Sequence, residues 1–237
     1  HTHHGHVIFR TPPPVPFPNF CAVSQFLAGE ISSTLGIPVE AVHNGIDVES
    51  YPFREDHEDF LLFVGRITSY KCPHEFIEVC KRARVRGIIV GQTKLVESQS
   101  YVLDVMRRCA LTGGLVRFLG TVSEEVKRDL MSRAKAIVVP SRFGEPLGLV
   151  SLEAQATGCP AIVYNDGGLP ETVCIRHKRR TGFICLGLDE MVEVVKHRLD
   201  EVRPANCRRW VEAKFDYRLM ARRYVELYRR VLEGDEW

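Results

Sequence analysis

The sequence lacks several features that mark specialised protein classes. No apolar run approaches the roughly 18 to 20 residues that cross a bilayer, and no charged-then-apolar leader opens the chain. Lysine and arginine total 32 against 30 aspartate and glutamate residues, so the net charge of +2 lacks the excess expected of a protein that wraps nucleic acid. These absences predict a cytoplasmic protein with no nucleic-acid partner, and they leave contact with the inner face of a membrane open.

Cysteine occurs eight times but never in a C-x-x-C pair, which argues against a structural zinc site or a small disulfide scaffold. We therefore expect reduced thiols. Four histidines fall within the first six residues, at His1, His3, His4 and His6, but they have no fixed scaffold and we predict no metal site there. The chain opens on histidine rather than methionine, and we interpret it as a fragment.

The composition, 45% hydrophobic and 26% charged, is that of one large or two modest globular domains. The proline-rich stretch RTPPPVPFPNF predicts an extended connector. CAVS then predicts a short buried strand, followed by a helix over about 25–35 that Ser24 can cap, a strand near 39–43 and a tight turn at Asn44-Gly45. The charged REDHED marks a break, so we place a domain boundary near residue 55, with 1–55 as a remnant of a first domain and a linker.

A regular alternation follows the break. Strands are predicted at DFLLFVG, GIIVG, LVRFLG, AIVVP and PAIVY, and helices around 74–84, 97–111 and 123–134 and from Pro146 or Leu147 onward. Fully apolar strands that alternate with helices are typical of a parallel sheet covered on both faces. The pattern predicts a doubly wound α/β domain over 56–190.

The C-terminal segment, 191–237, is predicted to be helical. Tyr217, Met220, Tyr224, Leu227 and Val231 recur at helical spacing and make one apolar face. We expect these helices to pack on the α/β domain or to cross back to the first domain.

Unusual residue clusters follow the predicted strands. They are Gly65-Arg66, Gly91, Gly120-Thr121, Ser141 to Glu145 and Asn165 to Gly168. Ligands of doubly wound sheets bind in the crevice outside the carboxyl ends of the strands. The sequence therefore predicts one rim that collects the binding chemistry.

Charged residues at this rim suggest the ligand class. Arg66 and Lys71 suit a phosphate or diphosphate, and the helix start after Glu145 offers free N–H groups to an anion. Glu145 and Glu153 lie among small and apolar residues, where an ionised carboxylate needs a partner from elsewhere in the chain. Carboxylates also accept hydrogen bonds from the hydroxyl groups of a ribose or a sugar ring. Cations for a diphosphate beside carboxylates for hydroxyls predict a nucleotide-sugar site.

The stretch SRFGEPLGLVSLEAQATGCPAIVYNDGGLPE resembles the signature of the family 4 retaining glycosyltransferases, in which seven residues separate two glutamates. FVGRITSYK, RFLGTVSEE and AVHNGID resemble other markers of that family, over about residues 20–185. The resemblance implies a GT-B architecture of two facing Rossmann-like domains, no obligatory metal or cofactor, and a donor bound mainly by the second domain. The first domain is largely missing here.

Carried over by position, the resemblance implies catalytic roles for Arg66, Lys71 and Glu145, the cations holding the donor diphosphate and Glu145 contacting the transferred sugar. Glu153 would bind the ribose, and His4 of HTHHG would reach the site from the acceptor side. The remaining implied donor-binding residues are Gly65, Gly120, Thr121, Val122, Gly144, Gly148, Leu149 and Val150, with the loop 120–122 meeting the base.

The resemblance predicts sugar transfer from a nucleoside-diphosphate sugar, with retention of configuration, to an acceptor that the sequence does not identify: a lipid-linked, saccharide or small-molecule acceptor. Two alternatives stay open, a nucleotide-sugar epimerase or hydrolase of the same fold and a non-catalytic nucleotide-sugar binding module. The basic run IRHKRR is expected to be a solvated loop, with attraction to an anionic acceptor or a membrane surface as its alternative.

Overall fold

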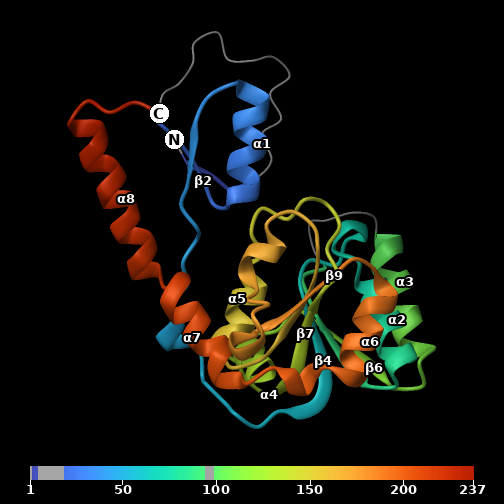
Figure 1. The fold of residues 1–237 in the computed structure, drawn as a ribbon. Helices are drawn as coiled ribbons and strands as arrows, with labels where there is room; N and C mark the ends of the chain where they lie inside the picture. Colours follow the sequence, from blue (N-terminus) through green and yellow to red (C-terminus); the bar gives the residue numbers. More distant parts are fainter. Residues whose placement is uncertain (1, 5–18, 94–98) are drawn as a thin grey trace.

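The computed structural model describes residues 2–4, 19–93 and 99–237, and the residues treated below are these (Figure 1). A three-stranded parallel sheet contains β1 (Thr2–His3), β2 (Phe20–Ala22) and β3 (Val39–Ala41). A six-stranded parallel sheet contains β4 (Glu58–Val64), β5 (Arg86–Val90), β6 (Val116–Gly120), β7 (Ala134–Val139), β8 (Ala161–Tyr164) and β9 (Gly182–Cys185).

The helices are α1 (Gln25–Leu35), α2 (Pro73–Ala83), α3 (Gln99–Ala110), α4 (Glu124–Arg133), α5 (Leu149–Ala156), α6 (Leu188–His197), α7 (Pro204–Lys214) and α8 (Tyr217–Leu232). Short 3₁₀ helices are η1 (Val48–Ser50), η2 (Ser69–Lys71), η3 (Leu169–Thr172), η4 (His177–Arg179) and η5 (Leu199–Glu201). Ser24 caps α1 as predicted, since its Oγ accepts from Leu27 N at 3.0 Å; Ser123, which was not predicted as a cap, accepts from Val126 N at 3.3 Å at the start of α4.

The six strands run in the order β6-β5-β4-β7-β8-β9, the strand order of a dinucleotide-binding sheet. The chain moves outward from β4 to β6 and then returns to the other side of β4 with β7. The strand order therefore reverses between β4 and β7, and a crevice opens at that point outside the carboxyl ends of the strands. The prediction of a doubly wound α/β fold is confirmed.

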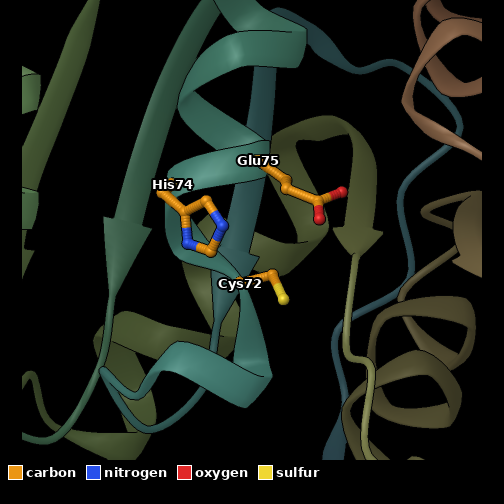
Figure 2. A group of neighbouring side chains, drawn as sticks. All are labelled: Cys72, His74 and Glu75. Carbon is orange, nitrogen blue, oxygen red and sulfur yellow. The ribbon is translucent and has the colours of Figure 1, made fainter.

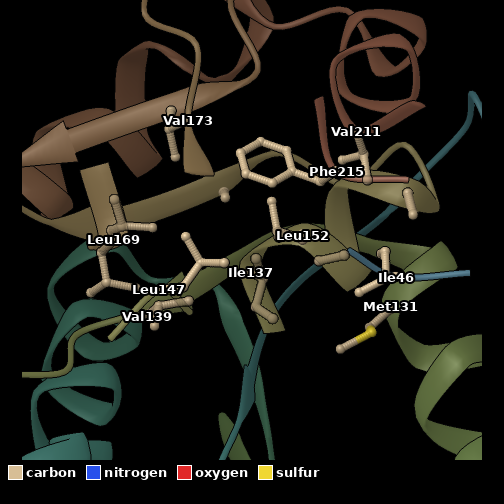
Figure 3. Close-up of a cluster of buried hydrophobic side chains, with 14 of the residues drawn as sticks. Ile46, Met131, Ile137, Val139, Leu147, Leu152, Leu169, Val173, Val211 and Phe215 are labelled. Atoms are coloured by element: carbon tan, nitrogen blue, oxygen red, sulfur yellow. The ribbon is translucent and has the colours of Figure 1, made fainter. Parts of the chain in front are cut away.

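Helices cover both faces of the six-stranded sheet, which explains the apolar runs in its strands. Helices α2, α3 and α6 lie on one face, and α4, α5 and α7 on the other (Figure 1). Leu61 and Leu62 of β4 are both fully buried, one in the hydrophobic cluster of each face. Figure 3 shows the cluster beneath α5 and α7, where Ile137, Leu152 and Phe215 meet. Burial on both sides fixes the strand ends and so the positions of the loops that follow them.

Helix α8 returns to the three-stranded sheet. Leu227 packs against Cys21 and Val42, and Glu40 of β3 accepts hydrogen bonds from Arg223 at 3.0 Å and Arg230 at 2.9 Å. Helices α6 and α7, in contrast, contact the six-stranded sheet and its helices. Of the predicted apolar face, Tyr217 and Val231 are each 40% exposed. The chain thus connects the two sheets twice, first between β3 and β4 and again through α8.

The predicted tight turn at Asn44-Gly45 is wrong. Ile46 instead forms a parallel bridge to Asp216 at the point where the C-terminal segment crosses back. A Cβ on Gly45 would lie 2.5 Å from the Cα atom of Tyr217. Residue 45 must be glycine because the backbone of Tyr217 lies so close to it. The local sequence does not reveal this, because a glycine after asparagine is equally typical of a turn.

Three other expectations change. Strand β9 was not predicted, because its GFIC run is short and starts with glycine; a Cβ at Gly182 would meet Ala161 O of β8 at 2.0 Å. Helix α5 begins at Leu149 rather than at Pro146 or Leu147. Strand β4 begins at Glu58, inside the charged run expected to be a linker. The proline-rich connector, apart from its last two residues, lies outside the described residues.

All eight cysteines are buried free thiols, as expected. Burial raises the pKa of several, including Cys80 and Cys159, so they are protonated and packed as small apolar side chains. Among the helices of the described residues, none combines the length and hydropathy needed to cross a membrane.

Candidate functional site

A cleft of about 350 Å³, the central cleft, opens where the strand order reverses. Its walls come from the loop after β4, the start of α5 and the first, three-stranded region. The residues that line it are His4, Val23, Asn44, Val64, Gly65, Arg66, Lys71, Glu145, Pro146, Leu147, Gly148, Leu149, Val150 and Glu153. Most of the residues predicted for a binding site therefore share one cavity.

Lys71 supplies the partner that Glu145 requires. Its Nζ lies 2.5 Å from Glu145 Oε2, and the two side chains are only 14% and 13% exposed. The lysine ammonium also lies 4.8 Å from the ring centroid of Phe143. An ammonium has three N–H donors, so Lys71 keeps donors for a further anion while bound to Glu145.

Glu153 has a different set of partners. Lys127 of α4 lies 3.2 Å from Glu153 Oε2 and also binds Glu124 at 2.7 Å. Burial and the hydrogen bond and charge of Glu153 raise the pKa of the Tyr51 hydroxyl, which stays a neutral donor. Glu153 is thus held as an oriented carboxylate in the wall of the central cleft, with partners other than Lys71.

Arg66 follows β4 and differs from Lys71 in having no acidic partner within the described residues. Its side chain is exposed, and its guanidinium lies 5.6 Å from the ring centroid of Tyr70. An unneutralised cation beside a lysine-carboxylate pair leaves net positive charge at the mouth of the central cleft. That charge favours an anionic ligand.

The loop that carries Glu145 is fixed by Asp166. Asp166 Oδ1 accepts from the backbone N–H groups of Phe143 at 3.3 Å, Gly144 at 2.7 Å and Glu145 at 3.3 Å. Gly167 has a φ of +58°, and a Cβ there would lie 2.4 Å from Glu145 N. The two loops can therefore approach only because residue 167 has no side chain.

Gly148 caps the N-terminus of α5 with a φ of +97°. A Cβ at this position would meet Leu169 Cδ2 at 2.5 Å. The first residues of a helix have N–H groups without helical acceptors, and the helix dipole is positive at this end. Leu149 and Val150 are the first residues of α5 and line the central cleft. Their backbone N–H groups are therefore placed to bind an anion in it.

Four predicted residues do not line this cleft. Gly120 is the last residue of β6, and Thr121 and Val122 follow it; Gly120 O accepts from Gly91 N at 2.9 Å, and Val122 packs against the core. Gly144 lies in the Glu145 loop with its N–H on Asp166. The loop 120–122 shares the sheet edge, but it lies beyond the walls of the central cleft.

The first region contributes His4, Val23 and Asn44 to the same cleft. It is tied to the six-stranded region by Glu171 of η3, whose carboxylate accepts from Gln25 N at 2.9 Å and Phe26 N at 2.8 Å at the start of α1. His43 Nε2 lies 2.6 Å from the same carboxylate. Burial alone would raise the pKa of Glu171, but these hydrogen bonds outweigh it and lower the pKa.

Sequence reasoning missed Tyr51, Lys127, Asp166 and Glu171. Lys127 stands three residues after Glu124 on a predicted helix, which indicates a local ion pair rather than a partner for Glu153. Asp166 and Glu171 lie in NDGGLPE, whose glycines and acidic residues mark it as a loop at the rim. Their actual partners come from other loops, so no local pattern identifies them.

Cys72, His74 and Glu75 gather at the start of α2, next to Lys71 (Figure 2). Their potential ligand atoms lie within 4.8 Å of one another. Each already has a protein partner: Cys72 Sγ donates to Ser69 O, His74 Nδ1 is 2.8 Å from the Tyr101 hydroxyl, and Glu75 binds Arg142 at 3.0 Å and Tyr164. Burial, together with the charge of Glu75, raises the pKa of Cys72 to about 11, which disfavours the thiolate that a metal needs.

Residues 49–201 match the family model of the glycosyl transferases group 1. The chain is 29% identical over 212 residues to a glycogen synthase of Mycobacterium tuberculosis (strain CDC 1551 / Oshkosh), covering 83% of this chain and 50% of that protein. It is 28% identical over 241 residues to an uncharacterized glycosyltransferase, MJ1607, of Methanocaldococcus jannaschii, covering 89% of this chain and 60% of that protein. The chain therefore spans about half of the length of these relatives.

Solved structures of other proteins share the fold of this chain. AviGT4, a glycosyltransferase involved in avilamycin A biosynthesis, superposes with a TM-score of 0.77 at 25% identity, covering 100% of this chain and 68% of that one. HepE of Anabaena, in complex with UDP and glucose, superposes with a TM-score of 0.75 at 19% identity, covering 88% of this chain and 62% of that one.

The fold is thus the parallel-sheet, Rossmann-like fold of GT-B glycosyltransferases. The chain belongs to the glycosyl transferases group 1 family.

Proposed function

We propose that this chain is the donor-binding part of a retaining glycosyltransferase of family 4. It binds a nucleoside-diphosphate sugar in the central cleft, and the sugar is transferred with retention of configuration to a lipid-linked, saccharide or small-molecule acceptor. Family membership supports the reaction class. The complex of HepE with UDP and glucose supports a nucleotide-sugar donor.

The observation that carries the proposal is the Lys71-Glu145 pair at the start of α5, with Arg66 beside it in the same cleft. In the proposed complex, Arg66 and the remaining donors of Lys71 hold the diphosphate, and the amides at the start of α5 contribute hydrogen bonds. Positive charge placed where the nucleotide departs stabilises the developing negative charge. We propose that these cations serve this role without a metal or cofactor.

Glu145 and Glu153 address the hydroxyl groups on either side of the diphosphate. Glu145 has its second oxygen available for the transferred sugar while Oε2 holds Lys71. Glu153, oriented by Lys127 and Tyr51, accepts from the ribose. We assign the loop 120–122 to the base, and His4 to the acceptor side of the reacting sugar.

Retention follows in this proposal if the acceptor attacks from the face that the nucleotide leaves. Acceptor selection and full activity belong to the first domain, of which 1–55 is the proposed remnant, while 56–190 binds donor and 191–237 joins the two. We propose that the reaction takes place in the cytoplasm, where nucleotide sugars serve as donors. Whether the protein contacts the inner face of the membrane then depends on the acceptor.

A panel of nucleoside diphosphates and their sugars, titrated against the chain by thermal shift and calorimetry, tests donor binding. A bound ligand raises the unfolding midpoint by mass action. We expect UDP or another diphosphate to bind and the matching sugar nucleotide to bind more tightly. Failure of every member of the panel to bind would reject the proposal.

Product analysis then separates transfer from the alternatives. A labelled donor is incubated with candidate acceptors and with the protein that contains this chain together with a first domain. Label that moves only when an acceptor is present indicates a transferase, and the anomeric configuration of the product tests retention. Acceptor-independent release of sugar, or a changed donor epimer, would instead indicate a hydrolase or an epimerase.

A further inference from the structure

A second cavity, the outer cleft, lies between the segment after η3 and helix α7. Its volume is about 730 Å³, larger than that of the central cleft. Ile175, Arg176 and Arg179 line it from the basic run, and Arg209, Trp210 and Lys214 line it from α7. The basic run is exposed over residues 175–179, as expected of a solvated loop, and it also forms one wall of this cavity.

The charge of this cavity is not neutralised from within. Arg176, Arg179, Arg209 and Lys214 are exposed, and within the described parts of the chain none of them has an acidic partner. Their neighbours differ, since Arg180 lies 3.2 Å from Glu201 and Arg208 lies 2.7 Å from Glu212. Four like charges that converge on one cavity repel one another, so an anion between them would relieve that repulsion.

Hydrogen bonds hold the two walls together. Asn206 of α7 donates through Nδ2 to Lys178 O at 3.2 Å and to Arg180 O at 3.5 Å. Trp210 Nε1 donates to Thr172 O at 2.9 Å, which fixes the indole in the cavity wall. The loop and the helix that carry the cations therefore keep their relative positions.

The outer cleft also has an apolar side. Val173 and Cys174 are buried in its wall, Trp210 is partly buried, and Ile175 is 55% exposed. Arginine binds phosphate through two parallel N–H donors, and lysine binds it as a point charge. An apolar wall beside such groups accommodates the carbon portion of a phosphate ester.

We propose that the outer cleft is a second anion site that binds a phosphate-bearing ligand, separate from the donor in the central cleft. The phosphate lies among Arg176, Arg179, Arg209 and Lys214, and the carbon portion packs on Trp210 and Ile175. The ligand is a soluble phosphate compound or the headgroup of an anionic lipid, which share this chemistry. The inference does not depend on donor identity or on sugar transfer.

Calorimetric titration with inorganic pyrophosphate tests the site, using the double variant Arg66→Ala/Lys71→Ala so that the central cleft does not contribute. Adding Arg176→Ala and Arg209→Ala removes one cation from each wall, and we expect pyrophosphate to bind about a hundredfold more weakly, because two charge-assisted hydrogen bonds are lost and each costs about tenfold. The matched control adds Lys178→Ala and Arg222→Ala, two exposed cations that do not line the cavity. It should leave binding within about twofold, the scale of a surface charge effect.

Sedimentation with phosphatidylglycerol-phosphatidylcholine vesicles, compared with vesicles of phosphatidylcholine alone, tests whether the site binds the headgroup of an anionic lipid. Loss of either pyrophosphate or anionic-vesicle binding in the Arg176/Arg209 variant alone supports the site and identifies its source of phosphate. Equal losses in the test and control variants would show diffuse charge attraction and overturn the proposal. Binding of neither probe would overturn it as well, provided that thermal unfolding shows all variants to be folded.

Discussion

The central and outer clefts are both bordered by basic side chains, but only the central cleft pairs a cation with a carboxylate inside it. Lys71 is bound to Glu145 with both side chains largely buried, whereas Arg176, Arg179, Arg209 and Lys214 are exposed and have no acidic partner among the residues that the structure describes. A paired lysine is held in one place and can orient a ligand. Unpaired surface cations attract an anion but leave its orientation to the ligand.

The two clefts also differ in the backbone that forms their walls. The wall of the central cleft requires glycines at 148 and 167, because two loops touch there. The outer cleft is walled by a loop and a regular helix, with Asn206 and Trp210 bonding across the gap. Close backbone approach suits a ligand held through amides, and long side chains suit a ligand held through its charge.

Segment η3 lies between the two clefts. Leu169 packs against Gly148 at the central cleft, and Thr172 O accepts from Trp210 at the outer cleft and from Gln155 Nε2 of α5 at 3.0 Å. The walls of the two clefts therefore share one buried set of contacts. Substitutions can still separate the clefts, because their charged residues are distinct.

The largest expected effect comes from removing both cations of the central cleft. Arg66→Ala/Lys71→Ala should weaken UDP binding by about 3 kcal/mol or more, since a charge-assisted hydrogen bond contributes about 1.5 to 3 kcal/mol. Arg176→Ala/Arg209→Ala should leave the affinity of UDP for the central cleft unchanged. Calorimetry measures both, and equal losses in the two variants would remove the distinction between the clefts.

The two glutamates of the central cleft should then separate by ligand. Glu153→Gln is expected to weaken both UDP and a UDP-sugar by about 1.5 to 3 kcal/mol, because it removes a charged acceptor for the ribose. Glu145→Gln should weaken only the sugar-dependent part of the affinity. The comparison uses paired titrations, and identical losses for both ligands in both variants would contradict the assigned roles.

Gly148→Ala tests whether the central cleft depends on backbone approach. Its positive φ and the 2.5 Å contact with Leu169 predict a loss of about 1 to 3 kcal/mol in the free energy of unfolding. Gly187→Ala is the matched control, because no atom lies within 4 Å of the added Cβ and its φ is extended. Denaturant titration measures both, and similar stabilities would mean that Leu169 yields without cost.

The smallest expected effect concerns Glu171, which joins the first region to the six-stranded region at the central cleft. Its lowered folded-state pKa means that the ionised form stabilises the fold fully above the ordinary value of 4.5, and that this is lost as pH falls through the folded pKa. Glu171→Gln should cost about 1 kcal/mol at neutral pH. The cost should vanish in acid.

Thermal unfolding of wild type and Glu171→Gln between pH 3 and 7 checks this expectation. Glu193→Gln, an exposed residue of α6, is the control and should show no such dependence. A difference between wild type and Glu171→Gln that stays constant across this range would show that charge at residue 171 does not stabilise the contact.

Local pattern was sufficient for most of the fold. The apolar runs that predicted β4, β7 and β8 are buried because helices cover both faces of the sheet, and α1 begins next to Ser24, the serine expected to cap it. Strand β9 and the crossing at Gly45 were not predictable, because in each case glycine serves a neighbour distant in sequence. A glycine in the sequence shows that a side chain is missing at that position, but it does not show which neighbouring atom occupies the space.

The amino-acid sequence by itself determined the alternation of strands and helices, and with it the rim to which Arg66, Lys71, Glu145 and Glu153 belong. It also required partners for the two glutamates, since desolvating a carboxylate is costly. Only the tertiary structure decided that Lys71 and Lys127 are those partners, that Glu171 reaches α1, and that the basic run meets α7 in a second cavity. Burial and periodicity are recorded locally along a chain, whereas the pairing of charges depends on which loops the strand order brings together.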